Sequence, residues 1–145
     1  MNMRRSALHS LLWLAPAVAI YAACFSLNVG GAWHGGPAQW HQLAVTVIYI
    51  LFCAVFTWNA RSSRGRLLFC RVFSALTLAA GVMGLLSRAL PGDWLVLPAL
   101  VLTPFSSIPL YGLRYFTSWI VLELISITLS SLWFTYSLFL RKSYK

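Results

Sequence analysis

The chain has 145 residues, of which 60% are hydrophobic and 9% are charged, and its formal net charge is +9. The longest polar connections, 30–42 and 61–66, are too short to bury a core of their own, which excludes a separate soluble domain. In a soluble protein this charge would suggest nucleic-acid binding. Here the basic residues lie beside long apolar runs, where they set membrane orientation and contact lipid headgroups. We therefore expect the lipid bilayer, and no nucleic acid, as a partner.

Long apolar runs cover most of the chain. About 20 mainly apolar residues in a helix, rising 1.5 Å each, match the roughly 30 Å thickness of the hydrocarbon layer. The runs occupy residues 11–29, 43–58, 67–87, 94–113 and 116–140. The sequence predicts an all-α fold: a polytopic integral membrane helical bundle of four or five transmembrane helices, forming a single transmembrane domain over residues 1–145.

The first run, 11–29, has two interpretations. Ala22-Ala23-Cys24 loosely resembles the end of a lipoprotein signal, but Tyr21 fits poorly at the first position of such a motif. The run is also longer than the usual apolar core of about 7 to 15 residues in a cleaved signal. We expect an uncleaved first span. The three cysteines each lie inside an apolar run and predict small buried side chains rather than a disulfide framework.

Basic residues predict how the spans are oriented. Arg4 and Arg5 precede the first run, and Arg61, Arg64 and Arg66 follow the second. The loop between these two runs has no lysine or arginine over residues 30–40. Since cytoplasmic loops carry an excess of lysine and arginine, both basic segments should be cytoplasmic. We expect an integral protein of the bacterial inner membrane with a cytoplasmic N-terminus.

The fourth run, 94–113, decides between four and five spans. Prolines remove backbone donors and disturb helices, so the run is either a kinked span or a re-entrant loop that returns to its own side. Its length allows one crossing. The positive-inside rule favours four spans, because only then do the basic residues at 141–145 lie in the cytoplasm. The breaking residues and the polar pair between them are Pro98, Pro104, Ser106, Ser107 and Pro109.

Small and hydroxylated residues recur at helical spacing in several runs. In the last run, Glu123, Ser126 and Ser130 share one face, and Ala15, Ala19 and Ala23 form a similar stripe in the first. Such stripes let membrane helices approach closely and form hydrogen bonds across the contact. We expect them to serve helix packing; the alternative is that the polar stripes converge on a pathway through the membrane.

Glu123 is the one acidic residue well inside an apolar run. A carboxylate in hydrocarbon costs a few kcal/mol and normally has a partner or a proton. If the last helix enters from outside, Arg88 lies at its depth; if it enters from inside, Arg71 is the nearer candidate. The two hypotheses are an ion pair that fixes helix register and a protonatable carboxylate coupled to transport.

The sequence contains no complete catalytic, cofactor or metal site. His34 and His41 flank the loop after the first run, but no cysteine or acid accompanies them to complete a metal site. Nucleophilic catalysis requires a base and an orienting group beside a serine or cysteine, and the few acids and histidines are scattered between runs. We expect a protein that is not an enzyme and carries no cofactor.

Two functions remain compatible with the sequence. The first is a non-enzymatic accessory or assembly component, which holds another membrane protein, or itself, through small-residue faces. The alternative is a small oligomeric transporter or channel that uses Glu123 and the broken segment 94–113, since broken segments with serines often line substrate or ion sites. We favour the first, because only one acid lies in the membrane and no internal repeat is visible.

Overall fold

A computed structural model describes residues 2–60, 64–90 and 93–140. Four helices in this part are long and apolar enough to cross a membrane. They are α1 (Asn2–His34), α2 (Trp40–Ala60), α3 (Arg64–Ala89) and α5 (Trp119–Phe139). The prediction of an all-α helical bundle is confirmed. The residues at 61–63 and 141–145, on which part of the orientation argument rests, lie outside the described residues.

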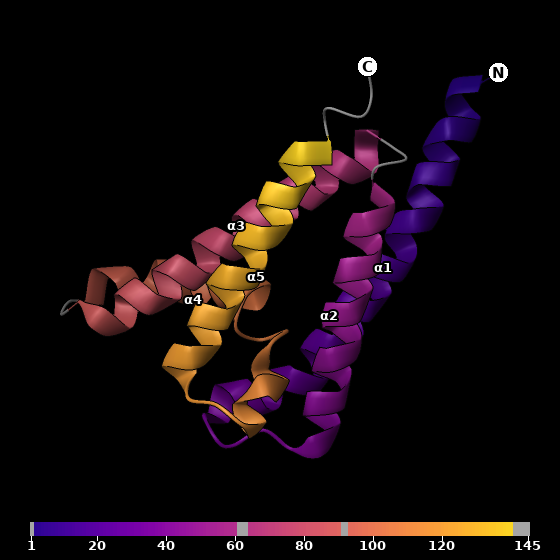
Figure 1. Ribbon diagram of the computed structural model, residues 1–145. Coiled ribbons are helices and arrows are strands. Elements are labelled where there is room, and N and C mark those ends of the chain that lie inside the picture. Colours follow the sequence, from indigo (N-terminus) through magenta and orange to yellow (C-terminus); the bar gives the residue numbers. More distant parts are fainter. Residues whose placement is uncertain (1, 61–63, 91–92, 141–145) are drawn as a thin grey trace.

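The long helices alternate in direction. α1 descends to the loop at residues 35–39, α2 returns, and α3 descends again at a tilt (Figure 1). α5 rises beside α3, so that its last turn lies at the same end of the bundle as the start of α1 and the end of α2 (Figure 1). Contacts bear this out: the ring of Tyr136 near the end of α5 stacks on Trp58 near the end of α2, with centroids 6.2 Å apart.

The fourth apolar run does not form a span. Residues 93–115, which cover this run, form η1 (Asp93–Leu95), α4 (Val96–Leu102), η2 (Thr103–Phe105) and η3 (Tyr111–Tyr115). The seven residues of α4 reach about 10 Å, far short of the hydrocarbon thickness. η2 begins at Thr103, and Pro104 at its second residue has no amide hydrogen to continue the helical hydrogen bonding.

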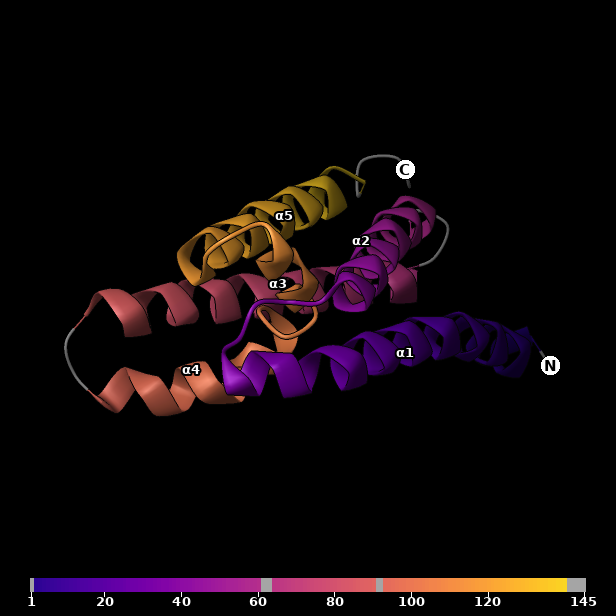
Figure 2. The same cartoon turned by 90° about the horizontal axis from the view of Figure 1, so that it is seen from below.

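This re-entrant segment, residues 93–116, folds back into the bundle. α4 returns along α3, and η3 lies against α2 near the loop that joins α1 to α2 (Figures 1 and 2). The segment therefore leaves on the side to which α1 descends. The sequence left open a kinked fifth span or a re-entrant loop. The fold has four long helices and a re-entrant segment.

The interior is more polar than the surface. The fully buried side chains include Asn28, Thr46 and Glu123. Large apolar side chains lie outside: Leu51 is 59% exposed and Leu132 is 62% exposed. Water-soluble proteins show the opposite arrangement, because apolar burial drives their folding. An apolar exterior around a hydrogen-bonded interior fits a chain whose helices face lipid.

Candidate functional site

Glu123 lies in the first turns of α5, where the re-entrant segment meets α3. Its side chain is 0% exposed. The Ser107 hydroxyl donates a hydrogen bond of 2.6 Å to Oε1, and the Ser106 and Ser107 hydroxyl oxygens are 3.2 Å apart. Arg88 near the end of α3 brings Nη2 within 3.9 Å of the same carboxyl oxygen, while its own side chain is 40% exposed. Glu123 thus joins three segments of the chain.

A glycine on α3 makes room for this carboxyl group. A Cβ placed on Gly84 would lie 2.7 Å from Glu123 Oε1, and one on Gly81 would lie 2.9 Å from the Ile127 side chain. α3 and α5 run in opposite directions, so each residue further along α5 faces one further back along α3. The small-residue stripe predicted on α3 therefore packs against the polar stripe of α5, as close membrane-helix contacts require.

Three buried oxygens on this face of α5 have no hydrogen-bond partner among the described residues: Glu123 Oε2, Ser126 Oγ and Ser130 Oγ. Their spacing of three and four residues aligns them along the helix. An unsatisfied buried polar atom costs about 1–3 kcal/mol, so natural structures contain few of them. An ion pair between Glu123 and Arg88 does not account for the unpartnered hydroxyl oxygens of Ser126 and Ser130.

A second polar cluster fixes the other side of the re-entrant segment. The Pro109 carbonyl oxygen accepts hydrogen bonds from the Asn28 amide (3.2 Å), the Thr46 hydroxyl (3.0 Å) and the Cys24 thiol (3.1 Å). The Asn28 amide also donates to Thr46 Oγ1 at 3.0 Å. Pro109 lies where the helix is broken, so its carbonyl has no helical partner. Side chains of α1 and α2 satisfy it instead, as backbone in a membrane interior requires.

Further contacts hold both ends of the segment. The Tyr21 hydroxyl donates to the Pro104 carbonyl at 2.8 Å, and the Tyr111 hydroxyl donates to the Gly36 carbonyl at 2.6 Å. The Gly112 amide donates to Thr46 Oγ1 at 3.1 Å, and a Cβ on Gly112 would overlap the Gln42 carbonyl oxygen. Together these contacts hold the segment close to α1 and α2.

The structure separates the two arginines proposed as partners of Glu123. Arg88 lies beside it, whereas Arg71 lies near the opposite end of the α3–α5 contact and donates a 2.8 Å hydrogen bond to the Ser137 carbonyl. The guanidinium carbons of Arg88 and Arg114 each lie 5.1 Å from the centroid of the Trp119 ring. The Trp119 ring thus lies close to two cations, one of which also approaches the Glu123 carboxyl group.

The serines and prolines predicted in the fourth run mostly take part in the two polar clusters or in the contacts beside them. Ser106 and Ser107 reach the Glu123 site, and Pro104 and Pro109 supply carbonyls to the hydrogen bonds above. Pro98 lies in the first turn of α4, where the missing amide hydrogen is not needed. Sequence reasoning missed Asn28, although an amide inside an apolar run was a usable signal.

No metal site is formed in the part of the chain that the structure describes, since no three histidine, cysteine or acidic side chains gather there. An apolar cavity of about 250 Å³ lies in the bundle, but Glu123 is not among its lining residues.

Comparison of the chain with protein-family models, curated proteins and solved structures gives no match. A function must therefore be argued from the geometry.

Proposed function

We propose that this protein is a non-enzymatic accessory or assembly component of a membrane complex, and that it binds a helix of a partner through the outward face of α1. Between the exposed Leu12 and Trp33, this face carries small residues that are all exposed: Ala15, Ala19, Ala22, Ala23, Ser26 and Gly30. At 3.6 residues per turn they lie opposite the buried Cys24 and Asn28. This exposed stripe is the observation that carries the proposal.

The outward face of α2 differs from this stripe. α2 exposes Val47, Ile48, Leu51 and Val55, which are the large side chains that lipid normally contacts. Small residues instead let the backbones of two membrane helices approach, and packing of this kind drives their association. A Cβ on Gly30 would meet no atom within 4 Å. The face of α1 thus has the composition of a helix contact, and none of the described residues packs against Gly30 on it.

Binding is tested by pull-down of the chain from its native membrane in mild detergent. We expect a stoichiometric, unlike membrane protein, and we expect Ala22→Leu to remove it by blocking close approach. Ala54→Leu is the matched control, since Ala54 is exposed on α2. A homo-oligomer that moves solute across liposomes would contradict the proposal, as would equal recovery of the partner with both variants.

A transporter or channel is the second candidate, supported by the unpartnered oxygens of Glu123, Ser126 and Ser130. In that case Glu123 would exchange a proton along the α3–α5 contact. Glu123→Gln should then preserve membrane insertion and abolish pH-driven transport in liposomes. An unchanged transport rate in this variant removes the carrier role. The 0% exposure of Glu123 and its place outside the cavity favour the first candidate.

The orientation is part of the same proposal. The end of the bundle at which α2 ends and α3 begins carries Arg64 and Arg66, and α1 begins at this end (Figure 1). By the positive-inside rule this end faces the cytoplasm of a bacterial inner membrane. Cysteine accessibility at Gly36 and Gly65 tests it: only a cysteine at Gly65 should react from the cytoplasmic side.

A further inference from the structure

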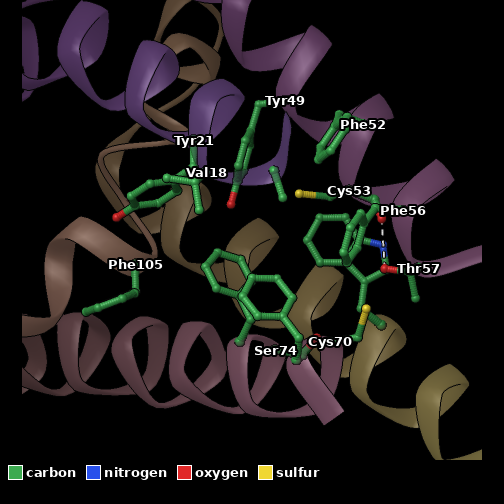
Figure 3. A pocket seen from close by; sticks show the side chains of 14 residues that line it. Val18, Tyr21, Tyr49, Phe52, Cys53, Phe56, Thr57, Cys70, Ser74 and Phe105 are labelled. Atoms are coloured by element: carbon green, nitrogen blue, oxygen red, sulfur yellow. Dashed lines mark hydrogen bonds between the residues drawn. The ribbon is translucent and has the colours of Figure 1, made fainter. Parts of the chain in front are cut away.

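The bundle contains an apolar cavity that neither polar cluster uses. Its volume is about 250 Å³, and α1, α2, α3, α5 and η2 all contribute to its wall. Figure 3 shows the side chains of Tyr49, Phe52 and Phe56 along one side of it, with Phe105 at another. An engineered apolar cavity of about 150 Å³ stays dry and binds benzene, so this cavity has room for a larger apolar group.

The cavity extends toward the basic end of the bundle. Its α2 residues run from Tyr49 to Thr57, and α2 ends at Ala60; its first α3 residue is Phe69, five residues after the start of that helix. Val18 on α1 lines the cavity and is also 59% exposed, so the cavity reaches the lipid-facing surface beside α1. The Tyr21 hydroxyl is engaged with Pro104, which leaves the wall mainly aromatic and aliphatic.

Arg66 lies on α3 nearer the basic end of the bundle than the cavity residues of that helix, and its side chain is half-buried. Arg66 precedes Phe69 and Cys70 by three and four residues, so the three share one face of the helix. The rise to Phe69 is about 4.5 Å, within reach of an arginine side chain. Arg64, in the same turn, is exposed. An apolar cavity below a guanidinium group matches a molecule with an apolar chain and an anionic head.

We propose that the cavity binds one acyl chain of an anionic phospholipid from the adjacent leaflet, with the phosphate at Arg66. The chain enters beside Val18 and lies among the aromatic rings of α2 and α3. Aromatic and apolar walls with a small number of placed polar groups are typical of sites for such ligands. The bound chain would fill the space among α1, α2 and α3 without contacting Glu123.

The test uses the full chain in nanodiscs of phosphatidylcholine that contain a trace of phosphatidylglycerol with a diazirine in one acyl chain. After irradiation, mass spectrometry maps the labelled residues. We expect label at Phe56, Phe69 and Phe73 well above the label on the lipid-exposed Leu51 and Val55. Equal labelling of the two groups would overturn the proposal.

A matched pair of variants tests whether the cavity holds the chain. Ala17→Phe places a ring in the cavity and should remove most of the label, whereas Ala54→Phe adds the same ring on the outward face of α2 and should leave the label unchanged. Circular dichroism and gel filtration establish that Ala17→Phe is folded; if it is not, Ser74→Leu fills the cavity from α3. Unchanged label in a folded filling variant contradicts the proposal.

A third arm tests the headgroup. Diazirine phosphatidylcholine with the same acyl chain should label the cavity about fivefold less, the ratio that about 1 kcal/mol per arginine near an anionic group gives. Arg66→Gln should bring the two lipids to equal labelling without removing the label. A wild-type cavity that takes both lipids equally would overturn the assignment of Arg66 as the phosphate site.

Discussion

Small residues occupy two kinds of position in this chain, and the two differ in what lies against them. Gly84 and Gly112 lie in the interior, where a single added carbon would collide with the Glu123 carboxyl group or with the backbone of α2. The small residues on the outward face of α1 are exposed, and Gly30 has no atom near its missing side chain. The interior glycines are explained by contacts within the chain. For the outer ones, we propose a contact with another molecule.

Gly112→Ala should have the largest effect on folding. The new Cβ would overlap the Gln42 carbonyl oxygen and displace η3 from α2, which also breaks the hydrogen bond from the Gly112 amide to Thr46. We expect the free energy of unfolding to fall by about 3 kcal/mol, the upper range for overpacking. Steric trapping in bicelles measures it. A change below that of Gly30→Ala would mean that η3 does not pack as described.

Gly84→Ala should be the next most damaging change. Its Cβ would meet Glu123 Oε1 at 2.7 Å, and a flexible side chain yields more easily than backbone, so we expect a loss of about 2 kcal/mol. Combining it with Glu123→Ala in a double-mutant cycle should recover part of this loss, because the clash disappears. Strict additivity of the two variants would show that the carboxyl group is not what limits residue 84.

Asn28→Leu compares the two faces of α1 directly. The change removes the amide that donates to Thr46 and Pro109, while Pro109 keeps its bonds from Thr46 and Cys24. We expect a loss of about 1 kcal/mol in the same unfolding measurement, since hydrogen bonds between membrane helices contribute roughly this much. Ser26→Ala on the outward face is the control and should change nothing. Equal effects of both variants would remove the distinction between the faces.

The sequence was sufficient for the helices and for singling out Glu123 as an acid in the interior. The apolar runs place α2, α3 and α5 within a few residues, because hydrocarbon thickness fixes their length. Three prolines indicated the break in the fourth run, but not the direction of return, which depends on hydrogen bonds to side chains from distant segments such as Asn28 and Thr46. Only that direction decides that Arg88, and not Arg71, lies beside Glu123.

For the stripe of small residues on α1, the sequence likewise gives the position of the residues but not the direction in which they point. Spacing alone places Ala15, Ala19 and Ala23 on one face and predicts close packing, but it does not give the direction in which the face points. The inward face of α1 is defined by Asn28 and Cys24, whose partners are 18 to 85 residues away in sequence. Because those partners hold α1 by its other side, the alanines point outward.

Gly30→Ala should have the smallest effect on the isolated protein. With no neighbouring atom, the added methyl group costs nothing in packing, and the higher helix propensity of alanine should stabilise the fold by at most about 1 kcal/mol. The unfolding measurement in bicelles checks this. A destabilisation like that of Gly84→Ala would show that the outward face of α1 is in contact within the isolated chain.

We propose that the outward face of α1 contacts a partner helix. Photo-cross-linking in native membranes tests it most directly, with benzoylphenylalanine in place of Ser26 on α1 or of Leu51 on the lipid-facing side of α2. We expect one discrete product, containing an unlike membrane protein, from the Ser26 position and none from Leu51. No product from Ser26, or the same product from both positions, would contradict it.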